Sequence, residues 1–82
     1  PVINQLYVEN NTLYIECEPC CAIMLRTDSR LTRILREHTS KLTSADFSLD
    51  FPYKYIRVEL MDEKRNKAMT RAYTYNEINK NI

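Results

Sequence analysis

The sequence predicts an all-β domain: a small antiparallel β-sandwich of about six to eight strands, with a small barrel as the less favoured alternative. Strand-favouring residues (Val, Ile, Thr, Tyr and Phe) fill 25 of the 82 positions. Short runs of alternating polarity recur along the chain, and polar turns separate them at close spacing. The chain also has no glycine, so asparagine or aspartate must occupy turn positions that need a positive φ.

The N-terminal residues predict a β-hairpin. Residues 6–8 and 13–17 are the two strands, and residues 9–12 form a turn in which asparagine adopts the left-handed conformation. Pro19 lacks an N–H donor, so we expect it to interrupt the ladder before a third strand at residues 20–27.

The clearest strand of the sequence is residues 54–61. Ile56, Val58 and Leu60 point to one side of it, which is typical of a half-buried antiparallel strand. Arg57 and Glu59 point to the other side. The alternation therefore identifies which face of this strand belongs to the core.

A second hairpin and one short strand complete the predicted sheets. The charged residues 62–66 form a turn with Asn66 at the positive-φ position, and residues 67–75 return as the partner strand. Residues 46–50 form a shorter alternating strand. The predicted core combines the inward positions of all these strands: Leu6, Val8, Leu13, Ile15, Ile23, Leu25, Phe47, Leu49, Ile56, Val58, Leu60 and Ala68.

Residues 29–38 allow two interpretations. Apolar residues at helical spacing, behind possible caps at Asp28 and Ser29, predict one short amphipathic helix. A strand at residues 32–36 is favoured, because the rest of the chain is β and arginines protect an edge strand from unwanted pairing. A single domain thus covers residues 1–75, and the polar residues 76–82 are expected to fray.

Length and composition argue against an enzyme. A domain of this size buries only about 60–65% of its unfolded surface, which leaves little room for an enclosed active site. Without glycine, the chain cannot contain a glycine-rich phosphate loop or a nucleophile elbow. No apolar run has the roughly 20 residues of a membrane span, so no membrane partner is expected. The missing Met before Pro1 suggests a piece of a longer protein.

No catalytic, metal-binding or cofactor-binding residue is predicted in this chain. Cys17, Cys20 and Cys21 form an odd cluster, which we interpret as reduced thiols that act as small apolar groups in a cytoplasmic protein. Metal or redox chemistry is the alternative, but a zinc site normally needs a second ligand pair, and His38 is the only histidine. The carboxylates of residues 62 and 63 belong to a solvated turn.

Two binding functions fit the surface residues. Arginines in the middle third and six tyrosines could hold a single-stranded nucleic acid. The net charge of +1 argues against this partner, so nucleic-acid binding is the alternative function. Aromatic residues opposite the core could instead dock against a neighbouring domain. The candidate interface residues are Tyr53, Tyr55, Arg57, Tyr73 and Tyr75.

Residues 52–70, which read PYKYIRVELMDEKRNKAMT, resemble the C-terminal segment of PHP-family (polymerase and histidinol phosphatase) metal-dependent phosphoesterase-like proteins. Residues 13–16, 23–28 and 42–49 follow in the order of that family's appended β domain, so the resemblance extends over most of residues 6–75. The chain departs from the family pattern at three places: Asn66 stands near the usual turn glycine, Met69 replaces an aromatic residue, and Arg71-Ala72 replace Asn-Pro.

The resemblance implies an immunoglobulin-like, non-catalytic accessory domain at the C-terminus of a larger cytoplasmic hydrolase. In that role it would pack on the protein's own N-terminal catalytic barrel or mediate homo-oligomerisation. The family's metal-binding His and Asp residues belong to the barrel, and no position of this chain corresponds to them. Divalent metals are therefore expected only in the parent's catalytic domain.

Overall fold

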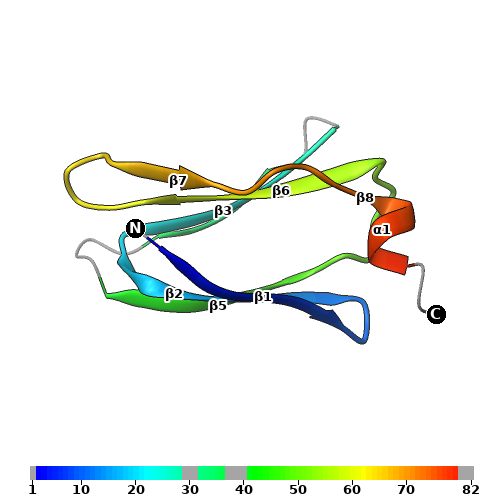
Figure 1. The fold of residues 1–82 in the computed structure, drawn as a ribbon, viewed down its shortest axis with the longest axis horizontal. Helices are drawn as coiled ribbons and strands as arrows, with labels where there is room; N and C mark the ends of the chain where they lie inside the picture. The colour runs from blue at the N-terminus through cyan, green and yellow to red at the C-terminus, as the bar shows by residue number, and fades with distance from the viewer. Residues whose placement is uncertain (1, 29–31, 37–40, 80–82) are drawn as a thin grey trace.

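The computed structural model describes residues 2–28, 32–36 and 41–79 as two antiparallel sheets packed face to face (Figure 1). One sheet has the order β1 (Ile3–Glu9), β2 (Thr12–Cys20), β5 (Leu42–Ser48). The other has the order β4 (Thr32–Arg36), β3 (Ala22–Thr27), β6 (Tyr55–Met61), β7 (Lys67–Met69), and β8 (Tyr73–Thr74) also pairs with β6. The short helix α1 (Tyr75–Asn79) lies at one end. The predicted small β-sandwich is confirmed.

The predicted N-terminal hairpin is present as β1 and β2. Asn10 and Asn11 have φ values of 52° and 57°, as a two-residue hairpin turn requires. The expected interruption of the ladder at Pro19 is present as a register shift, although strand β2 itself continues to Cys20. Pro19 is accommodated where the pairing of β2 with β5 shifts register between Glu16 and Cys20, a bulge that needs no ladder donor from it.

The middle of the chain forms a strand where the structure describes it. Residues 32–36 are β4, the edge strand that pairs with β3, so the alternative helix is wrong for these residues. The remaining residues of that prediction, with Ser29 and His38, lie outside the described residues. Asp28 does not cap a helix: its carboxylate accepts hydrogen bonds from the backbone N–H of Lys54 at 2.7 Å and of Tyr55 at 3.3 Å.

The second hairpin differs from the prediction in two details. Arg65, with φ 64°, occupies the positive-φ position instead of Asn66. Asn66 is held differently, because both its backbone N–H and its side-chain amide donate to the Asp62 carboxylate. The return strand is divided into β7 and β8, and between them the Thr70 hydroxyl accepts the hydrogen bond of the Val58 N–H at 3.0 Å.

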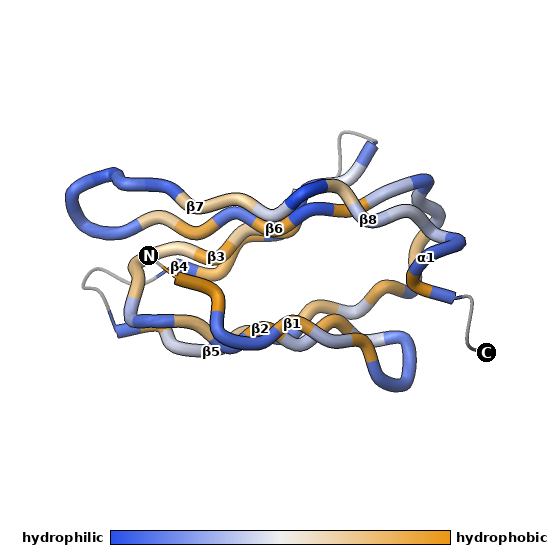
Figure 2. The backbone as a smooth tube through the Cα atoms, viewed as in Figure 1, coloured by the Kyte–Doolittle hydropathy of each residue, from blue (hydrophilic) through white to orange (hydrophobic). Residues whose placement is uncertain are grey.

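The core lies between the sheets, and the apolar strand segments that form it contrast with the hydrophilic hairpin turns (Figure 2). Nine of the predicted core residues are buried, while Leu6 and Ala68 are partly buried at its margin. Val8 was predicted to be in the core, but it is exposed, because it lies in the edge strand β1. The prediction omitted several residues of the core cluster: Cys17, Cys20, Ala45 and Tyr53.

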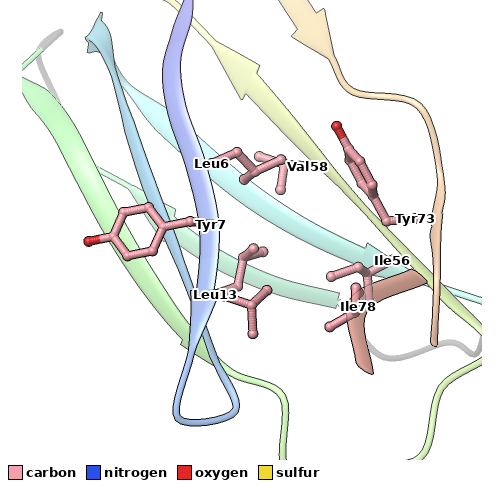
Figure 3. A pocket seen from close by; sticks show the side chains of 8 residues that line it. Leu6, Tyr7, Leu13, Ile56, Val58, Tyr73 and Ile78 are labelled. Carbon is pink, nitrogen blue, oxygen red and sulfur yellow. The ribbon is translucent and has the colours of Figure 1, made fainter. Parts of the chain in front are cut away.

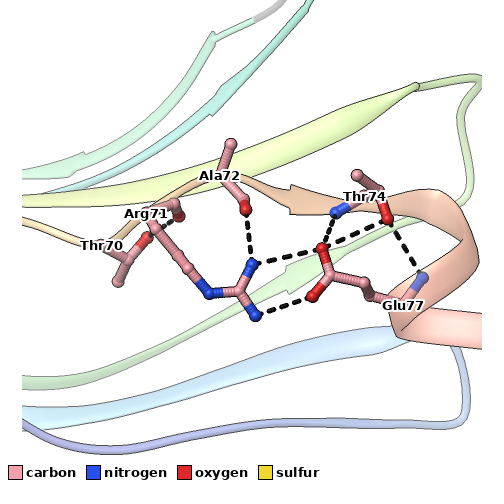
Figure 4. A network of polar contacts seen from close by, with 5 residues as sticks. All are labelled: Thr70, Arg71, Ala72, Thr74 and Glu77. Atoms are coloured by element: carbon pink, nitrogen blue, oxygen red, sulfur yellow. Dashed lines mark hydrogen bonds and ion pairs between the residues drawn. The ribbon is translucent and has the colours of Figure 1, made fainter.

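No helix in the described part of the chain is long and apolar enough to cross a membrane. The one helix in the described residues is short, and it corrects the expectation of a frayed tail for residues 76–79, while residues 80–82 lie outside the described residues. Thr74 and Glu77 form a capping box: the Glu77 N–H donates to the Thr74 hydroxyl at 3.2 Å, and the Thr74 N–H donates to the Glu77 carboxylate at 3.1 Å (Figure 4). Arg71 binds the same carboxylate at 2.7 Å. Ile78 packs against the core, so α1 closes the end of the sandwich.

The contacts of Glu77 predict that their contribution to the stability of the fold depends on pH. The hydrogen bond from Arg71 and those from Thr74 lower the pKa of Glu77 from 4.5 to about 2. Because the folded-state pKa is depressed, the contacts contribute fully above pH 4.5 and are lost as the pH falls toward 2. We expect an NMR titration of the Glu77 carboxyl carbon to give a midpoint near 2, and Arg71→Gln to raise it. A wild-type midpoint near 4.5 would contradict these contacts.

Candidate functional site

The two sheets carry opposite charges. Strands β1, β2 and β5 contain four acidic residues (Glu9, Glu16, Glu18 and Asp46) and no lysine or arginine. The strands of the five-stranded sheet contain five basic residues and one acidic residue, Glu59. The net charge of +1 therefore conceals a strong separation of charge between the two sides of the molecule.

The outward side of the five-stranded sheet, here named the basic face, combines cationic and apolar side chains. Alternation places Ile23, Leu25, Ile56, Val58 and Leu60 in the core, and their neighbours along each strand on the outer side. Register then aligns Arg26 with Arg57. The charged and large side chains of the basic face are Met24, Arg26, Ile34, Arg36, Tyr55, Arg57, Glu59, Met61, Lys67 and Met69.

Glu59 is the buried centre of the basic face. It is 4% exposed and pairs in register with Met24 on one side and Met69 on the other. Its carboxylate lies 2.9 Å from Nε of Arg26, whose side chain remains 41% exposed. A buried carboxylate needs such a partner, because burial removes the water that would otherwise solvate it. The ion pair thereby fixes the position of Arg26 on the face.

The five predicted interface residues do not form one surface. Tyr55 and Arg57 lie together on the basic face, and both are exposed. Tyr53 is buried, and its ring packs against Phe51 at 5.4 Å and Tyr75 at 5.3 Å, so it offers no docking surface. The Tyr75 side chain is exposed on α1.

Tyr73 lies elsewhere, beside an apolar hollow of about 250 Å³ between β1 and the β6–β8 edge (Figure 3). The Arg71 guanidinium covers its ring at 4.2 Å. The side chains of Leu6, Leu13, Val58 and Ile78 point into the hollow. Its lining offers no cluster of titratable groups, so we assign it no chemistry.

Sequence reasoning missed the apolar members of the basic face. Ile34 and Met69 are exposed, and both flank the row that runs through Met24 and Glu59. The alternation along each strand indicates which residues point outward. It shows that they share one face only once the pairing of β3, β4, β6 and β7 is known.

The described residues contain no group of three or more His, Cys, Asp or Glu side chains placed to hold a metal ion. Cys17 and Cys20 are buried, and burial raises the pKa of Cys17 to about 12. Burial is also the main cause that raises the pKa of Cys20. Since the thiolate is the nucleophilic form, neither residue is prepared for nucleophilic catalysis.

No family model, curated protein or solved structure matches this chain. The resemblance to PHP-family proteins therefore stays a prediction from the sequence.

Proposed function

We propose that this chain is a non-catalytic accessory domain that docks through its basic face onto an acidic surface of a catalytic domain in the same protein. The observation that carries the proposal is the joint exposure of Arg57, Tyr55, Ile34 and Met69 on one sheet face. The sequence resemblance supports a PHP-type metal-dependent phosphoesterase as the rest of the protein, with its divalent metals bound there. The three free thiols support a cytoplasmic location.

A protein partner fits the composition of the face. Tyrosine, methionine and arginine are enriched in protein interfaces, whereas lysine is depleted, and the basic face has one lysine among its ten charged and large side chains. Arginine also binds carboxylates through two parallel hydrogen bonds. An acidic partner surface would therefore satisfy Arg36 and Arg57 while covering the exposed apolar side chains.

The accessory role predicts where activity resides. We expect the purified chain to show no phosphoesterase activity with added Mn²⁺, and the product of the complete reading frame to show it. Activity of the purified chain that a chelator abolishes would overturn the non-catalytic assignment. An inactive product of the complete reading frame would overturn the phosphoesterase parent but leave the docking face to be tested separately.

A second candidate function uses the same face. The separation of charge favours binding of single-stranded nucleic acid, because Arg26, Arg57 and Tyr55 could contact phosphates and stack on a base. The measurement is fluorescence anisotropy of a labelled oligothymidine at several salt concentrations. The accessory role predicts no saturable binding at physiological salt. Tight binding that weakens steeply with salt and with Arg57→Ala, but not with Lys41→Ala, would replace it by the nucleic-acid function.

A further inference from the structure

Two of the three thiols meet inside the sandwich because of a bulge. Residues three positions apart in a regular strand point to opposite faces, so Cys17 and Cys20 should lie on different sides of β2. The register of β2 against β5 shifts between Glu16 and Cys20, which turns both side chains toward the core. Cys17 is 4% exposed and Cys20 is fully buried. Their Sγ atoms are 3.9 Å apart.

The third thiol is excluded from this pair. Cys21 is half-buried, and its Sγ lies 3.1 Å from the carbonyl oxygen of Met61 on β6. Its backbone N–H donates to the same carbonyl at 2.8 Å. Cys21 is therefore held against the five-stranded sheet, although it follows Cys20 directly in the sequence.

We propose that Cys17 and Cys20 are a redox-modification site, which low-molecular-weight disulfides such as oxidised glutathione convert to an intramolecular disulfide. One cysteine thiolate attacks a sulfur of oxidised glutathione, breaks its S–S bond and releases one glutathione. The second cysteine then attacks the protein sulfur of the mixed disulfide and releases the other glutathione. Two protein thiols are oxidised, the oxidant gains two electrons, and both protons end on the released glutathiones.

The geometry determines which pairing forms and how fast. With its partner in contact, the second step is intramolecular and should outrun a second encounter with glutathione. The first step is slow, because burial keeps both groups protonated and out of reach of the oxidant. The fold therefore selects the pair Cys17–Cys20, and transient opening of the bulge sets the rate.

The test is disulfide mapping of the folded chain after incubation with oxidised glutathione. The reaction is quenched with acid, free thiols are alkylated, and the remaining disulfides are reduced and labelled with a second reagent. Tandem mass spectrometry of the tryptic peptide that ends at Arg26 then assigns the label on each of the three cysteines. We expect two of the three thiols to be lost, a mass loss of about 2 Da before alkylation, and a link between Cys17 and Cys20 with Cys21 alkylated.

Two controls show that the fold, not the sequence spacing alone, selects this pair. Cys21→Ser should form the same link at the same rate. In concentrated urea, the chain should react faster and give links that include Cys21 and stable glutathione adducts. The proposal is overturned if the folded chain keeps all three thiols under conditions that oxidise the chain in urea. A folded-state link or adduct at Cys21, or a lasting adduct at Cys17 or Cys20, would overturn it equally.

Discussion

Replacing Leu25 with alanine lowers the free energy of unfolding by about 3–4 kcal/mol. Leu25 lies in β3, between β4 and β6, and its side chain is fully buried against the opposite sheet. Truncation removes apolar contacts and leaves a cavity that two paired neighbouring strands cannot close. Because small domains are stable by only about 5–15 kcal/mol, this single change removes a large share of the stability.

Chemical denaturation of the wild type and two variants measures this effect. Leu35→Ala is the matched control, because Leu35 lies in the adjacent strand β4 and is 40% exposed. It should cost less than about 1 kcal/mol. Equal losses for the two variants would contradict the position of the core between the sheets.

Replacing Arg26 with methionine destabilises the fold by about 2–3 kcal/mol, because the Glu59 carboxylate is left buried without its cation. This figure lies below the usual cost of breaking a buried pair, since Arg26 is partly exposed and its contribution is screened by solvent. The double variant Arg26→Met with Glu59→Met should recover most of the loss, because it removes the unpaired charge and adds apolar contacts beside Met24.

Arg57→Met is the matched control for the ion pair. Arg57 lies beside Arg26 in register on the same face but is exposed, and the structure shows no ion pair for it among the described residues. Its replacement should change stability by less than about 0.5 kcal/mol. Denaturation midpoints of the four proteins provide the comparison. A double variant as unstable as Arg26→Met would show that the buried charge is not the cause.

The sequence predicted most of the fold because alternation and turn chemistry are local properties. Ile56, Val58 and Leu60 identify the inner side of β6 without any knowledge of its neighbours. Asn10 and Asn11 specify the first hairpin turn. The prediction of a frayed tail is wrong for residues 76–79, although the signal for the helix is also local: Thr74 and Glu77 have the spacing of a capping box within a polar segment.

The site was less predictable because it depends on pairing between strands. The sequence placed Tyr55, Arg57 and Glu59 on the outer side of β6, but only the register of β3 and β7 brings Arg26 and Met69 beside them. The burial of Tyr53 could not be predicted either. Tyr53 precedes β6 in an irregular segment, where alternation does not apply, and contacts with Phe51 and Tyr75 place it in the core.

The docking of the basic face is tested most directly by chemical footprinting. The product of the complete reading frame and the isolated chain are compared by oxidation of Met69 and acetylation of Lys67, both exposed on the basic face. Exposed Lys41, next to β5 of the other sheet, is the control. We predict that both basic-face reactions slow several-fold in the longer protein while Lys41 reacts unchanged. Equal rates in the two proteins, or a reading frame that holds no further domain, would contradict the account.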